Sequence, residues 1–337
     1  MQKIGVFRLS AIGDVLMFLP TVRAIQRAYP DATIYWVISN PAYQLLQHID
    51  DIEFIVIDKP KGLFDYWRLY QQLKTYQFDV LLAAQASFRA HTMLPMLQAK
   101  RKIGYDRKRG QEGHAWVVNE TIPYREVHTL EGFMQFAEAI GVTDVTVEWR
   151  LGLEPQAVAW ADATVKTLVE PGPLVLINPC ASKPERSWHL AGYLEVIAYL
   201  KTHVQANIVL CGGPSSHDRE MADGILAQYE LPDYVGKTRL AELLALIARS
   251  DLLLCPDTGP AHMAAAVGTR VISLHGVTNP EISGPYGQLA HAINVYPEAV
   301  ALFKPVGRSW YDKVHHPQVM NLITSERVIE RIHQLLG

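Results

Sequence analysis

Short apolar runs alternate with amphipathic stretches along almost the whole chain, and this alternation limits the possible folds more than any other feature. In the first half the apolar runs lie at 4–7, 33–38, 54–57, 80–84 and 103–105. The pattern then restarts, with runs at 174–178, 207–211, 252–255 and 271–274. Strand-like and helix-like segments that alternate with short connections are typical of a parallel sheet covered by helices. We therefore predict an α/β protein made of two Rossmann-like, doubly wound domains.

The boundary between these domains is expected in residues 151–172, where proline and glycine bracket an alanine-rich helical segment. The 337 residues are enough for two domains of ordinary size. We predict an N-terminal domain over 1–160 and a second domain over 171–320. The amphipathic pattern at 325–336 predicts a C-terminal helix within 321–337, which we expect to pack back on the N-terminal domain.

Composition points to a soluble globular protein. No apolar run approaches the roughly 18 residues needed to cross a bilayer, and the N-terminus runs directly into a strand-like segment without the features of a signal peptide. Cys180, Cys211 and Cys255 are far apart, and each ends an apolar run, so we expect buried thiols rather than a disulfide or a metal site.

Charge is nearly balanced overall but uneven locally. The net charge of −3 argues against general nucleic-acid binding. Residues 100–109 hold six basic side chains and one acidic one. This segment is either a solvated loop or a binding patch for an anionic acceptor or anionic lipid headgroups.

The segment Pro256-Asp257-Thr258-Gly259-Pro260-Ala261-His262 follows a buried strand-like run and leads into an alanine-rich helix. A strand, a tight turn and a helix that begins near a proline present free backbone N–H groups at the sheet edge, where phosphate commonly binds. Two other interpretations remain. The letters D-T-G also mark aspartic proteases, although the helical continuation argues against that class, and Asp257 is also suited to capping the helix.

Polar turns follow several predicted strands, at 8–14, 179–188, 212–214 and 257–262. In open α/β sheets ligands bind outside the carboxyl ends of the strands. These four turns are therefore expected at the binding edges of their sheets.

Asp14 stands at the start of the first predicted helix. The turn before it is not a dinucleotide fingerprint, because it contains a single glycine, Gly13. The helix dipole stabilises a carboxylate at this position. Asp14 is either a capping residue or a general base that removes a proton from an acceptor hydroxyl.

The turn at 181–188 supplies a hydroxyl and two cations, Ser182, Lys183 and Arg186, which suit a diphosphate. Gly212 and Gly213 allow the backbone to approach a ligand closely, and a nucleoside is the natural candidate. The sequence contains no D-x-D pair, the usual motif for a metal that neutralises a diphosphate, so no metal or other cofactor is expected.

The motifs R-L-S-A-I-G-D-V, A-S-K-P-E-R-S-W, G-G-P and P-D-T-G-P-A-H-M-A-A-A, in this order, resemble the ADP-heptose:lipopolysaccharide heptosyltransferases of glycosyltransferase family 9. The resemblance implies a GT-B fold in which two domains face a central cleft, and inverting, metal-independent transfer of heptose. It implies that Asp14 is the general base and that Asp257, Thr258, Gly259 and His262 meet the sugar and phosphates of ADP-heptose. Arg186 falls where the family often has lysine.

The resemblance also implies an acceptor site in the first domain. The residues expected there are Ser10, Gly13, Gln85, Arg89, Arg101 and Arg107. This basic character would suit Kdo, a carboxylated sugar, so we favour transfer of the first heptose to Kdo-lipid A at the cytoplasmic face of the inner membrane of a Gram-negative bacterium. Transfer of the second or third heptose, a nucleotide-sugar epimerase of the same fold and a nucleotide-sugar-binding module remain alternatives.

Overall fold

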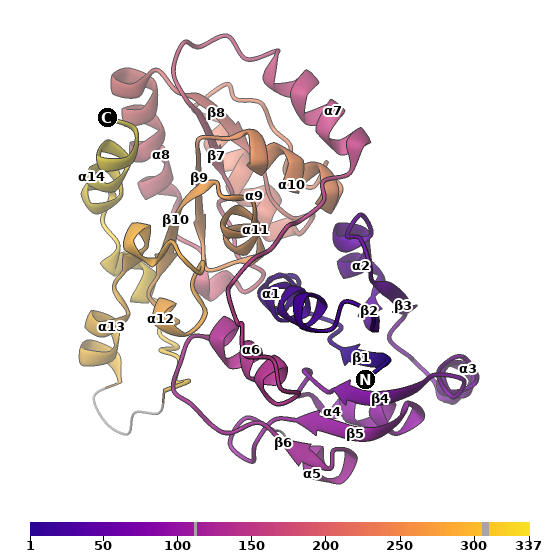
Figure 1. Ribbon diagram of the computed structural model, residues 1–337. Coiled ribbons are helices and arrows are strands. Elements are labelled where there is room, and N and C mark those ends of the chain that lie inside the picture. Colours follow the sequence, from indigo (N-terminus) through magenta and orange to yellow (C-terminus); the bar gives the residue numbers. More distant parts are fainter. Residues whose placement is uncertain (111–112, 305–309) are drawn as a thin grey trace. The chain divides into compact units, whose positions relative to one another are not determined.

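The computed structural model describes residues 1–110, 113–304 and 310–337, and divides into two compact units, Met1–Gly152 and Leu153–Gly337 (Figure 1). Each unit is an open parallel sheet with helices on its faces, so the predicted α/β fold with two doubly wound sheets is confirmed. Of the helices in these residues, none has both the length and the apolar character needed to cross a bilayer.

The first unit contains, among its described residues, a six-stranded parallel sheet in the order β3-β2-β1-β4-β5-β6. Its strands are β1 (Lys3–Phe7), β2 (Thr33–Ser39), β3 (Glu53–Ile57), β4 (Gln77–Leu82), β5 (Gln98–Gly104) and β6 (Glu120–Thr121). Its helices are α1 (Ile12–Ala28), α2 (Asn40–Leu46), α3 (Leu63–Leu73), α4 (Phe88–Met93), α5 (His114–Val117) and α6 (Thr129–Glu138).

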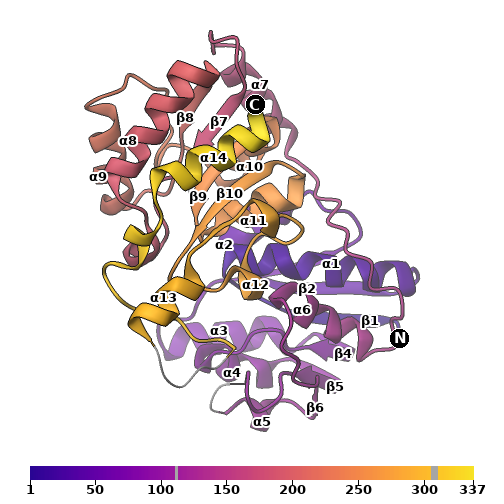
Figure 2. The ribbon, with the colours of Figure 1, turned by 90° about the vertical axis from the view of Figure 1, so that its left-hand side faces the viewer.

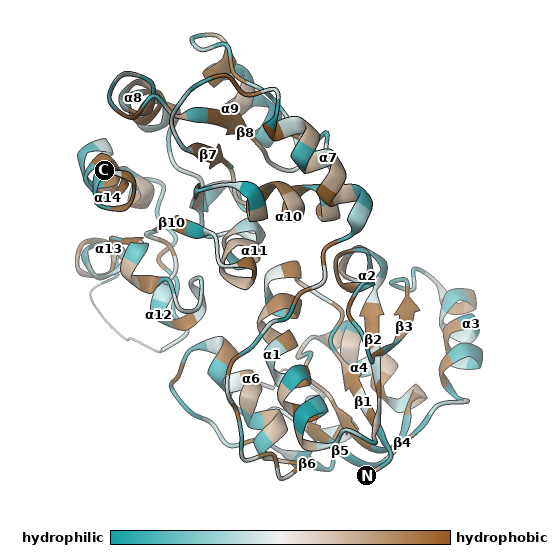
Figure 3. Cartoon of the chain, turned by 45° about the horizontal axis from the view of Figure 1, so that its top comes forward, coloured by the Kyte–Doolittle hydropathy of each residue, from teal (hydrophilic) through white to brown (hydrophobic). Residues whose placement is uncertain are grey.

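Alternate side chains of the first sheet enter two separate cores. On one face Trp36 of β2 meets Phe18 of α1, which also contacts Phe133 of α6, and Figures 1 and 2 show α1 and α6 side by side. On the other face, residues of α3 and α4 such as Leu69 and Met93 pack against the sheet. Burial on both faces explains why the central strands β1 and β2 are largely apolar, as Figure 3 shows.

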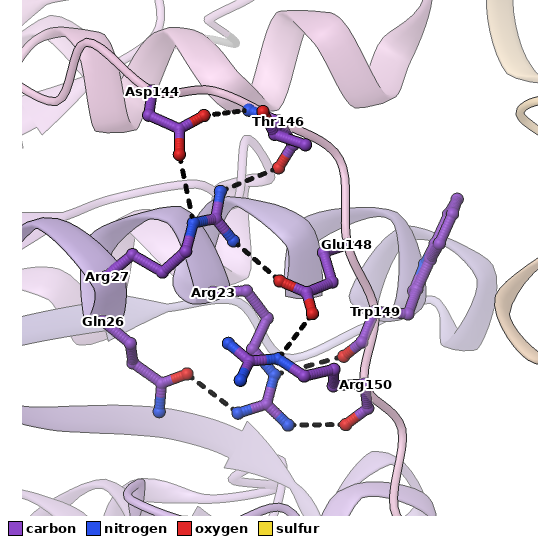
Figure 4. A network of polar contacts seen from close by, with 8 residues as sticks. All are labelled: Arg23, Gln26, Arg27, Asp144, Thr146, Glu148, Trp149 and Arg150. Atoms are coloured by element: carbon purple, nitrogen blue, oxygen red, sulfur yellow. Dashed lines mark hydrogen bonds and ion pairs between the residues drawn. The ribbon is translucent and has the colours of Figure 1, made fainter.

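The end of the first unit is held along α1 by a network of arginine contacts (Figure 4). Arg23 donates to the backbone oxygens of Trp149 and Arg150, at 3.1 and 2.6 Å. Arg27 pairs with Glu148 at 3.0 Å. These bonds fix the last segment before the division against the helix that carries Asp14 at its start.

In the second unit the described residues form a five-stranded parallel sheet in the order β11-β10-β9-β7-β8. Its strands are β7 (Leu174–Ile177), β8 (Asn207–Leu210), β9 (Leu252–Pro256), β10 (Arg270–His275) and β11 (Ile293–Asn294). Its helices are α7 (Pro155–Val165), α8 (Leu190–Tyr199), α9 (Ser216–Leu226), α10 (Leu240–Arg249), α11 (Gly259–Val267), α12 (Pro280–Ser283), α13 (Tyr296–Phe303) and α14 (Ser325–Leu336).

Short helical turns complete both units. They are the 3₁₀ turns η1 (Leu94–Met96), η2 (Pro184–Arg186), η4 (Leu289–His291) and η5 (Val319–Leu322), and the π-helical turn η3 (Leu200–Val204). Helix α8 is continued directly by the π-helical turn η3.

The division between the units falls eight residues before the predicted end of the first domain at residue 160. The difference arises because α7 packs on α10. Two ion pairs join these segments: Arg249 with Asp162 at 2.6 Å, and Arg239 with Glu154 at 3.0 Å. α7 therefore belongs to the second unit.

The C-terminal helix predicted within 321–337 is α14, and it packs on the second unit. Its apolar residues Val328 and Ile332 are fully buried in the core of the second unit. The helix lies against α8 and β10, beside α8 in both Figure 1 and Figure 2.

The three cysteines are buried as the sequence predicts, and two further buried positions show close packing. Cys180, Cys211 and Cys255 are buried free thiols, and burial raises the pKa of Cys211 to about 12. Trp188 is a packing residue: its ring is 1% exposed, and its indole N–H donates to the Ile323 carbonyl at 3.0 Å. Gly192 is required beneath this ring, because a Cβ there would lie 2.3 Å from it.

Candidate active site

The strand order of the first sheet reverses between β1 and β4, and a ligand site is expected where the loops after these strands diverge. Contacts join these two loops. Arg8, directly after β1, donates to the Ala84 carbonyl at 2.5 Å. The Gln85 side-chain oxygen accepts from the backbone N–H groups of Leu9 and Ser10, at 3.0 and 3.2 Å. Gln85 therefore fixes the backbone that leads into α1.

Asp14 lies in the first turn of α1 and forms an ion pair with Arg8. Its Oδ2 atom also accepts from the Ala11 N–H at 3.2 Å. Both contacts use Oδ2. No hydrogen bond between described residues reaches the other oxygen, Oδ1. The Arg8 side chain is buried, whereas the Asp14 side chain is 35% exposed. Asp14 thus caps its helix and also presents an oxygen that can accept a proton.

A cavity of about 810 Å³ opens at the same edge of the first sheet, beyond β1, β2 and β3. Ser10, Ala11 and Ile12 at the start of α1 form one wall. Three basic residues also line it, Lys59, Lys61 and Arg68, together with the acidic residues Asp58 and Asp65. Basic side chains thus exceed acidic ones by one, so the cavity can take an anionic molecule next to the helix that carries Asp14.

The predicted acceptor residues are only partly brought together. Ser10 lines the cavity, Gly13 is buried in the first turn of α1, and Gln85 holds the adjacent backbone. Arg89 and Arg107 are exposed, on α4 and on the turn after β5 respectively.

Arg101 is not brought together with this group. It lies within β5 and donates two hydrogen bonds of 2.7 Å to Glu120. A third bond reaches the Ala139 carbonyl at 3.2 Å. The same strand contains Lys100, which pairs with Asp79 at 3.0 Å. This part of the basic segment is therefore a strand whose charges are matched by its neighbours, rather than a loop.

In the second sheet the strand order reverses between β7 and β9. The turn after β7 carries Arg186, and the turn after β9 carries Asp257. These two side chains form an ion pair at 3.0 Å. Thr278, which follows β10, donates to the same Asp257 oxygen at 2.7 Å. The structure thus joins three turns at one carboxylate, at the position expected for a ligand site.

Asp257 is 8% exposed. Burial raises the pKa of its carboxyl, but His275, Arg186, Thr278 and His262 outweigh burial and hold that pKa below its usual value. The N-terminal cap of α11 is Thr258, so Asp257 serves as the anchor of Arg186 rather than as the helix cap. Thr258 and Gly259 begin α11 and are half-buried.

Cations converge beside this carboxylate. Lys183 is exposed on the turn after β7, next to the exposed Ser182. Partial burial lowers the pKa of Lys313, and the nearby charges of Arg186 and Lys183 lower it further. A group of three cations, Arg186, Lys183 and Lys313, is a favourable place for an anion that carries more than one charge.

The glycine turn after β8 has a fixed shape. The Gly213 N–H donates to Asp218 at 3.1 Å, and Ser215 also donates to that carboxylate. A Cβ at Gly212 would lie 3.2 Å from the same side chain. Asp218 therefore braces the turn, and the glycines leave room for this contact.

His275 at the end of β10 makes the folding stability of the protein depend on pH. Burial lowers the pKa of His275 to about 4, with Asp257 opposing the change and His262 and Arg186 adding to it. Between about pH 4 and about pH 6.5, His275 is protonated in the unfolded chain but not in the folded chain. Stability should therefore fall by about 2 kcal/mol between pH 7.5 and pH 5 from this group.

The measurement is urea unfolding of the second unit at both pH values. His275→Asn should reduce the difference in the free energy of unfolding between the two pH values by about the same 2 kcal/mol. An unchanged pH dependence in that variant would show that His275 is not the group responsible.

Sequence reasoning missed several of these residues. Thr278 follows a predicted strand, so its place at the sheet edge was a usable signal. Arg8 stands within the first polar turn, but its pairing with Asp14 was not evident. Lys313 comes from a segment without regular structure or periodicity, and no local pattern marks it.

Among the residues described in either unit, no three His, Cys, Asp or Glu side chains group closely enough to hold a metal ion. Two parallel sheets in one chain, the first with a carboxylate beside a cavity and the second with a group of cations at its reversal, are the arrangement of a GT-B glycosyltransferase.

Comparison with known proteins defines the family. The model of glycosyltransferase family 9 (heptosyltransferase) matches residues 66–304. The lipopolysaccharide core heptosyltransferase OpsX of Haemophilus influenzae is 36% identical over 343 residues, which span 99% of this chain and 97% of OpsX. The chain belongs to glycosyltransferase family 9, as its motifs predicted.

Solved structures agree on the fold. The family 9 glycosyltransferase of Veillonella parvula has a TM-score of 0.82 at 22% identity, covering 99% of this chain and 97% of its own. Escherichia coli heptosyltransferase WaaC, solved with ADP, has a TM-score of 0.74 at 18% identity, covering 99% of each chain. WaaC solved with ADP-2-deoxy-2-fluoro heptose has a TM-score of 0.70 at the same identity and coverage.

Proposed function

We propose that this protein transfers L-glycero-D-manno-heptose from ADP-heptose to Kdo in the inner core of lipopolysaccharide, as a peripheral enzyme at the cytoplasmic face of the inner membrane. The full-length similarity to a core heptosyltransferase carries the reaction class. The donor is supported by WaaC, a member of the same fold that was solved with an ADP-heptose analogue.

The acceptor proposal rests on the cavity of the first unit. Lys59, Lys61 and Arg68 outnumber the acidic lining residues Asp58 and Asp65 and offer cations to a carboxylate or phosphate, and Ser10, Ala11 and Ile12 of the same lining lead into the helix of Asp14. Kdo is a carboxylated sugar and matches this chemistry better than a neutral heptose. Ser10 lines the cavity, and Gly13, Gln85, Arg89 and Arg107 extend the same proposal as positioning or peripheral residues.

The proposed reaction is a single displacement with inversion. Asp14 removes the proton from the acceptor hydroxyl through Oδ1 as the oxygen forms a bond to the anomeric carbon. The bond between that carbon and the β-phosphate oxygen breaks, and ADP departs with the electron pair. Arg186, Lys183 and Lys313 neutralise the charge that develops on the diphosphate, so that the residues of the chain supply this stabilisation without a metal.

In this proposal Ser182, Gly212 and Gly213 lie along the nucleotide, and Thr258, Gly259 and His262 at the start of α11 meet the sugar and phosphates. The N-terminal turn of a helix offers its free N–H groups to phosphate. Asp257 acts through Arg186, whose guanidinium it orients.

The deciding experiment is a matrix of donors and acceptors followed by mass spectrometry. ADP-heptose and a UDP-sugar are each combined with Kdo-lipid A and with the same acceptor that already carries one heptose. We expect one heptose added to Kdo-lipid A from ADP-heptose alone. Addition only to the heptosylated acceptor would replace the proposal with transfer of a later heptose, and donor conversion without acceptor would indicate an epimerase.

Gln85→Ala tests the positioning of the first unit. Loss of the side-chain oxygen leaves the Leu9 and Ser10 N–H groups without their partner, so the backbone leading to Asp14 shifts. We expect kcat to fall by about 10- to 100-fold, with the KM for the donor unchanged. Steady-state kinetics with both substrates check this result. Gln47→Ala, on a half-buried glutamine at the end of α2, is the control and should retain full activity.

A further inference from the structure

The helix α3 exposes an unusual amount of apolar surface. Leu63 is 91% exposed, Phe64 63%, Trp67 57% and Tyr70 46%. At about 100° per residue these positions fall on one side of the helix. We call these four residues the aromatic face. Large apolar patches on a soluble protein mark places where a partner or a membrane binds.

The core does not account for this face, because α3 already buries a different side. Leu69 and Leu73 of α3 pack in the core beneath the sheet. The rings of the aromatic face instead contact one another and nearby cations. Phe64 and Trp67 stack with centroids 5.9 Å apart. Figure 3 shows both hydrophobic and hydrophilic residues on this helix.

Basic side chains surround the aromatic face. Lys59, Lys61, Arg68 and Lys74 are all exposed. The Arg68 guanidinium lies 4.9 Å from the Phe64 ring centre, and the Lys74 ammonium lies 5.7 Å from that of Tyr70. Residues 59–74 contain four basic residues and one acidic one, in a chain whose net charge is −3.

Aromatic and aliphatic side chains bordered by lysine and arginine are the pattern of helices that lie in the headgroup layer of an anionic membrane. The eleven residues of α3 are too few to span a bilayer. The neighbouring helix α4, joined to α3 by a 3.1 Å hydrogen bond between Tyr66 and Thr92, adds the 73% exposed Phe88.

A third side of α3 lines the cavity of the first unit, through Asp65, Arg68, Leu69 and Gln72. Asp65 and Gln72 lie on the side of the helix opposite Leu63 and Tyr70. One helix thus joins a core side, a cavity side and an exposed apolar side. A surface bound to the aromatic face would therefore be separated from the cavity by about the 10–12 Å width of α3.

We propose that the aromatic face of α3 docks on the surface of an anionic phospholipid bilayer. This inference rests on the proposed function only in taking the acceptor to be carried by a lipid. The rings enter the headgroup layer, the flanking cations meet the lipid phosphates, and the cavity is held at the height of an acceptor that projects from the membrane.

The test is sedimentation of the full chain with phosphatidylcholine vesicles, with and without one quarter phosphatidylglycerol. We expect binding to the anionic vesicles, and at least tenfold weaker partitioning for Phe64→Ser/Trp67→Ser. Leu302→Ser, a control on the 62% exposed Leu302 of the second unit, should bind within twofold of the unchanged chain. Because Phe64 and Trp67 are exposed, the melting temperature of the double variant should not change.

A chain that does not bind anionic vesicles, or a double variant that binds as well as the unchanged chain, would overturn the proposal. So would light scattering that shows a dimer dissociated by the same variant, because the face would then bind a second copy of the chain.

Transfer of heptose to a water-soluble, deacylated acceptor separates the docking proposal from the proposed function. Full transfer by the double variant in that assay, together with loss of transfer on vesicles, supports docking. Vesicle binding without transfer to either acceptor would contradict the proposed function alone.

Discussion

Asp14→Asn is expected to lower kcat by about 10²–10⁴-fold, because the amide cannot accept the proton of the acceptor hydroxyl. The substitution keeps the size of the side chain and an oxygen that can accept from the Ala11 N–H. Binding of ADP, which we assign to the second unit, should not change. Turnover is measured as release of ADP, and ADP affinity by calorimetry.

Asp14→Asn also removes the charge that pairs with Arg8, so a matched control is needed to separate this loss from the loss of the base. Glu242 of α10 has the same local role as Asp14: it lies in the first turn of its helix, accepts from the backbone N–H of Arg239 at 2.8 Å and pairs with that arginine. Glu242→Gln should therefore lose a similar capping contact but retain turnover within about twofold. If Asp14→Asn retains turnover within about threefold, Asp14 is not the base.

The sheets and their binding edges were predictable because both depend on short-range patterns. A strand buried on two faces is a run of apolar residues, as in Leu252–Cys255, and its following turn is marked by residues such as Asp257 and Gly259. Once the strands are parallel, their carboxyl ends share an edge. The sequence therefore located Asp14, Arg186 and Asp257 on such edges without any knowledge of side-chain contacts.

Charge pairing was not predictable, because it depends on which strands become neighbours. Arg101 looked like part of a basic loop, since a strand with several charged residues departs from the apolar pattern. Its bidentate contact with Glu120 of β6 exists only after β5 and β6 pair in the sheet. The same reason hides Lys313, which approaches Arg186 through the fold of the second unit and not through sequence spacing.

Arg186→Ala is expected to have the largest effect in the second unit, because it removes a cation from the proposed diphosphate site and also leaves Asp257 buried without its counter-charge. Breaking a buried ion pair in this way costs about 3–5 kcal/mol of stability. We expect kcat/KM for ADP-heptose to fall by about 10²–10³-fold. Urea unfolding and steady-state kinetics measure the two effects separately. Arg249→Ala, which breaks the exposed pair with Asp162, should cost no more than about 1 kcal/mol and leave kinetics unchanged.

The double variant Arg186→Ala/Asp257→Ala separates a structural role from a role in the reaction. Removal of both charges relieves the uncompensated carboxylate, so the free energy of unfolding should recover by at least about 2 kcal/mol relative to Arg186→Ala. The kcat/KM for the donor should stay low, because no guanidinium remains to meet the diphosphate. Recovery of donor kinetics along with stability would mean that Arg186 only neutralises Asp257. Arg186→Lys, which retains the charge but not the planar fork, should lie between these limits, with a loss of about tenfold.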